Sequence, residues 1–88
     1  MTLYKEIENS FPMIESLLSE EDLLEFKESP IKDLLFYHFG LGTWIRNNLL
    51  NTKENCLNSL FLENGVEDLD DMSFYIIMLF HYHVSKKI

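Results

Sequence analysis

The sequence predicts an all-α protein, a single compact bundle of five or six short helices that occupies residues 1–88. Apolar residues recur three or four positions apart along most of the chain. Capping residues and glycines separate the apolar segments, and no stretch shows the sustained apolar–polar alternation of a half-buried strand. A chain of 88 residues has room for one domain.

The N-terminal third should begin with a short helix that ends at Phe11. Pro12 lacks a backbone N–H and therefore suits the first position of a new helical stretch. Ser19 is the expected N-cap of the next helix, whose first turn is acidic, as the helix dipole favours. The acidic residues selected as a partner-binding face are Glu20, Glu21, Asp22, Glu25 and Glu28.

The middle of the chain should hold two helices joined by a glycine turn. The Ser29-Pro30 pair begins the first of them. Its buried face would carry Ile31, Leu34, Leu35 and His38. Gly40 and Gly42 should end it, because glycine readily adopts the left-handed conformation of a helix C-cap. Thr43 should cap the following helix, with Trp44 pointing inward.

The last third should contain two further helices. Asn51 with Glu54 resembles a capping box, and the helix after it would bury Cys56 and end at Asn64-Gly65. Asp68 should cap the last helix, whose main apolar stripe comprises Met72, Tyr75, Ile76, Leu79, Phe80 and His83. Its other side is also apolar and comprises Phe74, Ile77, Met78 and Tyr82. Such a helix is either central or half-exposed at an interface, so this other side is the predicted self-association surface.

Two polar side chains of the middle segment invite a functional interpretation. His38 lies on an apolar face, where a histidine bonded within the core is the favoured interpretation. Arg46 is the only arginine, and its planar guanidinium is expected to pair with Asp70 or Asp71. A small hydrolase or nuclease using His38 with Arg46 is the weaker alternative, so no enzymatic activity is predicted.

No metal or cofactor is predicted either. His81 and His83 are two positions apart, so on a helix they point to different faces. A single cysteine excludes both an internal disulfide and a four-cysteine zinc site. The N-terminus does not show the basic segment and apolar segment of a signal peptide, and no apolar run approaches the roughly 20 residues of a membrane span. A cytoplasmic protein is therefore expected.

Charge indicates the class of partner. Fifteen acidic residues against seven basic ones give a formal net charge of −8. Such a surface repels nucleic acid and anionic membranes and attracts basic proteins. Solubility alone is the competing explanation for this acidity.

Two blocks of the chain resemble a small bacterial domain family with no assigned biochemical activity. The first is FYHFGLGTWIRNN, from Phe36 to Asn48, and it is similar to the family's H-F-G-L-G-x-W-I-R-N signature. The second is LDDMSFYIIMLFHYH, from Leu69 to His83, which contains the D-D-M-S block. The resemblance implies a helical fold built around these blocks and no enzyme. Small acidic members of such families sometimes act as immunity proteins beside toxins, an analogy only.

The leading hypothesis is a cytoplasmic immunity or antitoxin protein that inhibits a basic toxin, with a nuclease as the expected kind. Acidic side chains would steer association and cover the toxin's basic cleft. The alternative is a helical interaction or regulatory module that forms a homodimer through its last helix.

Overall fold

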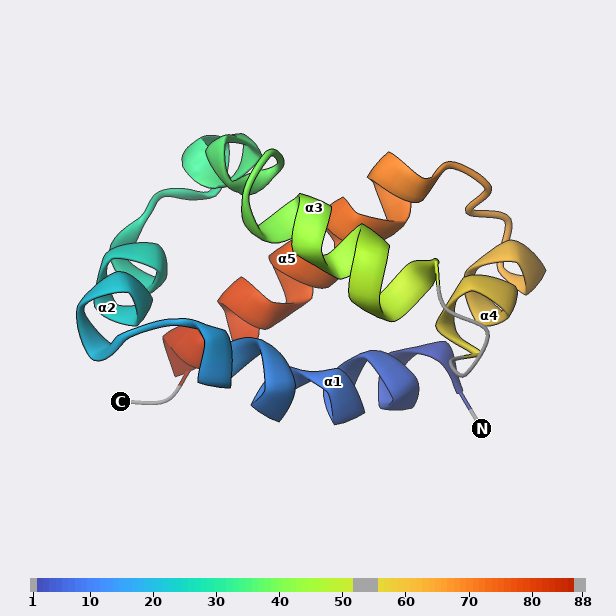
Figure 1. The fold of residues 1–88 in the computed structure, drawn as a ribbon, viewed down its shortest axis with the longest axis horizontal. Coiled ribbons are helices and arrows are strands. Elements are labelled where there is room, and N and C mark those ends of the chain that lie inside the picture. Colours follow the sequence, from blue (N-terminus) through green and yellow to red (C-terminus); the bar gives the residue numbers. More distant parts are fainter. Residues whose placement is uncertain (1, 52–55, 87–88) are drawn as a thin grey trace.

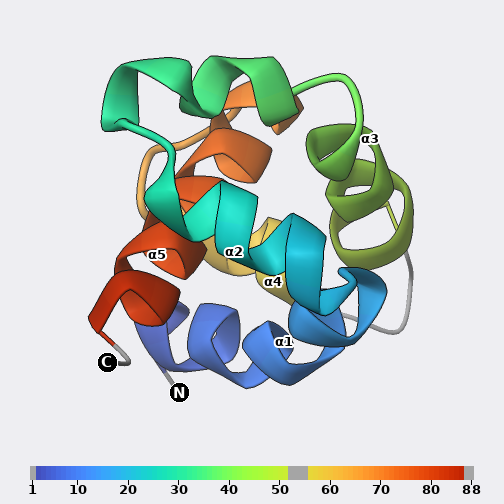
Figure 2. The same ribbon diagram turned by 90° about the vertical axis from the view of Figure 1, so that its left-hand side faces the viewer.

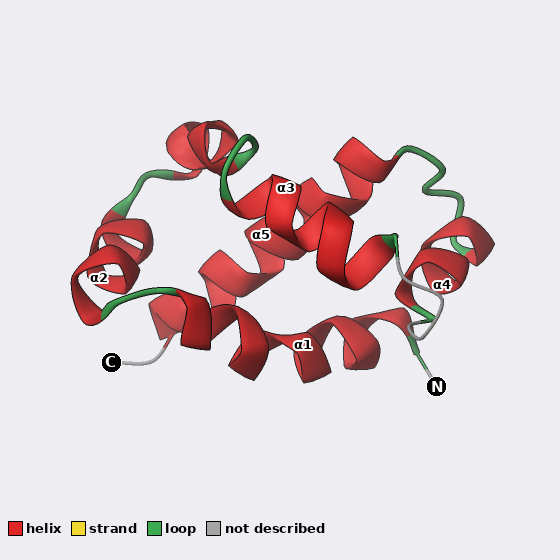
Figure 3. Cartoon of the chain, in the orientation of Figure 1, coloured by secondary structure: helices red, strands yellow, loops and turns green. Residues whose placement is uncertain are grey.

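A computed structural model describes residues 2–51 and 56–86, and these form helices and connecting loops without a strand (Figures 1 and 3). The elements are α1 (Leu3–Leu17), α2 (Glu20–Glu28), η1 (Ile31–Tyr37), α3 (Leu41–Ile45), η2 (Arg46–Leu50), α4 (Leu57–Glu63) and α5 (Leu69–Lys86). The element η1 is a 3-10 helix, and η2 is a π-helical turn that continues α3 without a break. The prediction of an all-α bundle is confirmed.

The helix α5 is the centre of the bundle. It packs against α1, α2, η1, α3 and η2. In Figure 1 it crosses the molecule diagonally behind α3, and in Figure 2 it lies along the left side. Phe80 of α5 lies between Phe11 of α1 and Phe26 of α2, with ring centroids 5.6 and 5.5 Å away. The two histidines of α5 diverge, as predicted: the Nε2–H of His81 donates to the Ser29 carbonyl at 3.0 Å, while His83 stacks on Phe11.

The first helix runs straight through Pro12, so the predicted boundary at Phe11 is wrong. A proline inside a helix costs about 3 kcal/mol, because one hydrogen bond is lost and the ring crowds the preceding turn. Ile7, Phe11 and Ile14 are nevertheless buried on one continuous side of α1, and each contributes roughly 1.5–3 kcal/mol by burial. Their combined burial outweighs the cost of the proline, which itself is exposed.

Three predicted caps are confirmed. The Ser19 hydroxyl accepts from the Asp22 N–H at 3.0 Å, and the Asp68 carboxylate accepts from the Asp70 N–H at 2.8 Å. Gly65 ends α4 with φ +85°, in the left-handed region that favours glycine. The N–H of Val66 then donates to the Phe61 carbonyl at 2.9 Å, and Val66 packs back on the core.

The predicted glycine turn after His38 forms differently. Among the described residues only Gly65 has a positive φ, and Gly40 has φ −95°. Gly42 is buried inside α3, and Thr43 is a helical residue whose hydroxyl donates to the Phe39 carbonyl at 2.7 Å. Gly42 is closely packed: a Cβ there would lie only 3.1 Å from Arg46 Nη1, whereas its distance of 3.6 Å from Ile77 Cδ1 is an ordinary contact.

Several burial predictions also change. Tyr75, placed on the main apolar stripe of the last helix, is 48% exposed. Ile31 and Leu35 are 69% and 62% exposed, because a 3-10 helix has three residues per turn. Its inward side therefore holds Leu34, buried as predicted, and the half-buried Tyr37. Cys56, expected in the core, is exposed. Ile77, predicted to lie on the exposed self-association surface, is fully buried against α3 near Gly42.

The predicted capping box involves Asn51 and Glu54. Asn51 terminates η2, its N–H donating to the Arg46 carbonyl at 2.8 Å. The expected partner Glu54 lies outside the described residues.

Candidate functional site

The Arg46 side chain links η2, where it begins, to the end of η1, to α3 and to α5. Its Nη2 donates to the His38 carbonyl at 3.3 Å and to the Thr43 hydroxyl at 2.9 Å. Its Nη1 donates to the hydroxyl of Ser73, a fully buried residue of α5, at 3.1 Å. Three neutral acceptors therefore surround the guanidinium of an arginine whose side chain is only 16% exposed, a geometry that suits the planar fork of arginine.

Asp70 completes this cluster from the first turn of α5. Its Oδ1 lies 3.6 Å from Arg46 Nε and 3.9 Å from His38 Nε2. The expected pairing of Arg46 is thus confirmed for Asp70, whereas Asp71 is exposed and borders a different hollow with Phe74 and Tyr75. His38 is half-buried, less enclosed than the predicted core histidine. The cluster connects the end of η1 with α3 and α5. These contacts give Arg46 and Asp70 a structural role in the fold.

The carboxylates of α2 form an exposed acidic surface. All five selected residues, Glu20, Glu21, Asp22, Glu25 and Glu28, are exposed. They lie on a helix at one end of the elongated molecule, with α4 at the opposite end (Figure 1). The nine residues of α2 place them on a short rigid scaffold whose start is held by the Ser19 cap.

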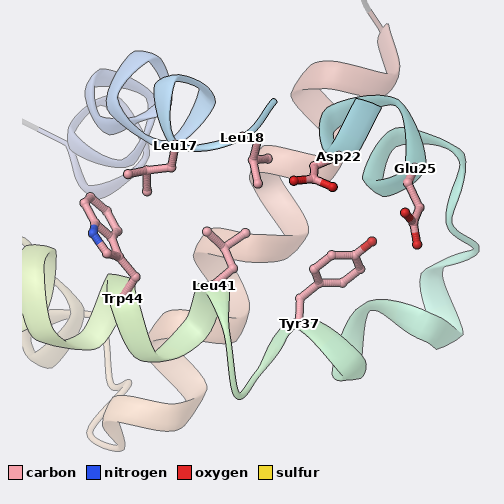
Figure 4. A pocket seen from close by; sticks show the side chains of 7 residues that line it. All are labelled: Leu17, Leu18, Asp22, Glu25, Tyr37, Leu41 and Trp44. Carbon is pink, nitrogen blue, oxygen red and sulfur yellow. The ribbon is translucent and has the colours of Figure 1, made fainter. Parts of the chain in front are cut away.

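Two of these acidic residues also line a pocket between α1, α2, η1 and α3, here named the Trp44 pocket. Its volume is about 500 Å³, and its lining residues are Leu17, Leu18, Asp22, Glu25, Tyr37, Leu41 and Trp44. Figure 4 shows Leu17 and Trp44 at one end and the carboxylates of Asp22 and Glu25 at the other. The pocket is therefore apolar at one end and acidic at the other.

The hydroxyl of Tyr37 has a defined hydrogen-bond direction at the acidic end. The Ser29 hydroxyl donates to the Glu25 carbonyl at 2.9 Å and lies 3.3 Å from the Tyr37 hydroxyl. Because the single Ser29 proton is already used, Tyr37 donates to Ser29 and keeps its lone pairs as acceptors. An edge-to-face contact with Phe26, with ring centroids 4.8 Å apart, fixes the Tyr37 ring. The acidic end consequently presents three side-chain acceptors.

Comparison with known proteins identifies the family. A sequence model described as "Domain of unknown function (DUF6794)" matches residues 5–84, which is most of the chain. The chain belongs to the DUF6794 family. The match includes both blocks noted in the sequence, from Phe36 to Asn48 and from Leu69 to His83. No curated protein and no solved structure matches this DUF6794 chain.

A second, apolar surface of the DUF6794 protein lies where α5 meets η1. A groove of about 420 Å³ there is lined by Ile31, Leu34, Met78, Leu79, His81, Tyr82 and Ser85. Of the predicted self-association residues, Met78 and Tyr82 line it and are 39% and 56% exposed. Phe74 is half-buried and shares a neighbouring hollow with Met78. The α5–η1 groove therefore retains two of the four predicted residues, Met78 and Tyr82, and gains Ile31.

Sequence reasoning missed more than half of the Trp44 pocket of this DUF6794 chain. No role in it was assigned to Leu17, Leu18, Tyr37 and Leu41, since their convergence depends on how four elements are packed. Trp44 was expected to point inward, but it is half-buried and forms a pocket wall. The one local signal was a lone tryptophan on a short helix, which does not distinguish a core from a pocket wall.

Within residues 2–51 and 56–86, no group of three or more metal-ligating side chains converges. None of the helices in this part of the chain combines the length and apolarity of a bilayer-spanning segment.

Proposed function

We propose that this protein is an immunity- or antitoxin-type inhibitor, which binds a basic protein toxin and covers its active cleft, with a nuclease as the expected kind. The observation that supports this proposal is the acidic surface of α2, whose five carboxylates are exposed and two of which line the partly apolar Trp44 pocket. A basic cleft that binds nucleic acid presents the complementary charge.

The physical mechanism has two stages. A net charge of −8 accelerates encounter with a basic protein and is screened as salt increases. Apolar contacts in the Trp44 pocket would then slow dissociation, because buried apolar groups and not rim charges dominate the stability of most interfaces. Inhibition by occlusion requires no turnover from this chain.

A pull-down from the native host tests the proposal. The tagged full chain should capture one stoichiometric basic partner at low salt and less of it at moderate salt. An E21K/E28K variant should lose that partner, since both residues are exposed on α2 and outside the Trp44 pocket.

The matched control is E63K/E67K, which makes the same change in net charge at exposed positions near α4. Retention of the partner by this control would attribute binding to the acidic surface of α2. Equal loss in both variants, or capture of no basic partner, would refute the proposal.

The α5–η1 groove supports a second candidate function, that of a self-associating module. Met78 and Tyr82 remain exposed around an almost wholly apolar groove, and Ile31 extends this surface onto η1. A homodimer would bury these side chains. Sedimentation should then give a dimer for the wild-type chain and a monomer for M78E. A wild-type chain that remains monomeric at high concentration would exclude this function.

A further inference from the structure

We infer that the Trp44 pocket binds the side chain of an arginine on the partner protein. The arginine belongs to the basic protein partner of the proposed function. The identity of the partner therefore rests on that proposed function. The pocket itself determines the chemistry of its occupant, through charge at one end and apolar walls at the other (Figure 4).

The acidic end calls for a cation that donates several hydrogen bonds. Asp22 and Glu25 contribute carboxylate oxygens, and the Tyr37 hydroxyl points toward them with its lone pairs free (Figure 4). No side-chain donor accompanies these acceptors among the pocket residues at that end. An anion would therefore be repelled, and a neutral group would leave the carboxylates without a counter-charge.

The apolar end fits the aliphatic stem and the neighbouring residue of such a side chain. Leu17 and Trp44 face each other there, and Leu18 and Leu41 lie between the two ends (Figure 4). The indole nitrogen is on the edge of the ring away from the carboxylates (Figure 4). The pocket's volume of about 500 Å³ lies within the range of sites that enclose a small ligand.

Arginine fits this arrangement better than lysine. Its five N–H donors spread across a plane, so one guanidinium can reach two carboxylates and a hydroxyl together. It is less strongly hydrated than an ammonium group and stacks on aromatic rings, and the Tyr37 ring lies beside the acidic end. A lysine would concentrate its charge at one point and satisfy fewer of the three acceptors.

The chain contains a built-in reporter for this test. Trp44 is the only tryptophan, so the fluorescence of the full chain reports directly on the pocket. The probe is the blocked tripeptide acetyl-Ala-Arg-Leu-amide, with versions that carry lysine or citrulline in place of arginine. We expect a saturable change with the arginine peptide, a weaker one with lysine, and none with citrulline, which keeps the shape but not the charge.

Two double variants localise the binding. D22N/E25Q should weaken the arginine peptide by roughly threefold to tenfold, through two lost interactions with partly screened charges. E63Q/E67Q removes the same charge outside the pocket and should leave the affinity unchanged. Amide spectra of the wild-type chain give a second readout that needs no variant: signals of Tyr37, Leu41 and the Trp44 indole should shift with the peptide.

Several results would overturn the inference. These are no saturable change with the arginine peptide, equal binding of the citrulline peptide, or equal weakening by both double variants. The pull-down separates this failure from that of the inhibitor function. A basic partner lost in E21K/E28K with no peptide binding refutes only the pocket, whereas peptide binding without any basic partner refutes only the inhibitor.

Discussion

Replacement of Arg46 by lysine is predicted to destabilise the fold even though the positive charge is kept. The guanidinium donates to three neutral acceptors, the His38 carbonyl and the hydroxyls of Thr43 and Ser73. These lie on different segments, so a single lysine ammonium can retain one of them. Two hydrogen bonds are lost, at about 1 kcal/mol each. We therefore expect R46K to lower the free energy of unfolding by about 2 kcal/mol.

The ion pair with Asp70 is expected to contribute much less. Its carboxylate is 61% exposed and lies 3.6 Å from Arg46 Nε, so water screens the interaction. Exposed pairs of this kind contribute about 0–1 kcal/mol. D70N should thus change stability by less than about 1 kcal/mol, and it serves as the matched control.

Urea and thermal denaturation followed by circular dichroism measure both variants. For a domain of this size, a loss of about 2 kcal/mol lowers Tm by roughly 8–16 °C. If the unfolding free energy of R46K is within about 0.5 kcal/mol of that of the wild type, the structural role assigned to the guanidinium of Arg46 is refuted. D70N as destabilising as R46K would instead make the ion pair the dominant contribution.

Further predictions concern stability and use the same denaturation measurements. G42A should lose about 1 kcal/mol of unfolding free energy despite the higher helix propensity of alanine, because its Cβ would lie 3.1 Å from Arg46 Nη1. The Cβ of G40A would meet no atom within 4 Å, so its unfolding free energy should stay within about 0.5 kcal/mol of the wild type. G65A should lose about 1 kcal/mol because φ is +85°. Two neighbouring residues of α5 should differ in the unfolding free energy that they contribute. I77A removes a fully buried side chain and should lose about 3 kcal/mol, whereas M78A removes one that is 39% exposed and should lose less than about 1 kcal/mol. Near-equal losses within either pair, or an unaffected G65A, would contradict the packing described.

Local sequence signals predicted the helices well where the decisive contacts are close in the chain. The cap at Ser19, the cap at Asp68 and the left-handed Gly65 each depend on atoms within five residues. Their geometry is therefore a property of the local sequence. The central position of α5 was one of two alternatives raised by its apolar composition.

Predictions failed where distant residues decide the outcome. Pro12 signals a helix start, but burial on both sides of it keeps α1 continuous. Gly42 signals a turn, but its lack of a side chain instead accommodates Arg46 and Ile77 within the bundle. A local sequence pattern does not indicate where a distant helix will pack against that segment.

Local sequence alone predicted an all-α chain, the caps at Ser19, Asp68 and Gly65, and the acidity of α2. It also predicted the pairing of the only arginine with Asp70 or Asp71. These follow from short-range hydrogen bonding and from charge, which composition and spacing encode directly. Only the tertiary structure decided that Ile77 is buried and that Trp44 forms a wall beside Asp22 and Glu25. The physical reason is that a pocket is made by the relative placement of helices, which depends on the packing of the whole core.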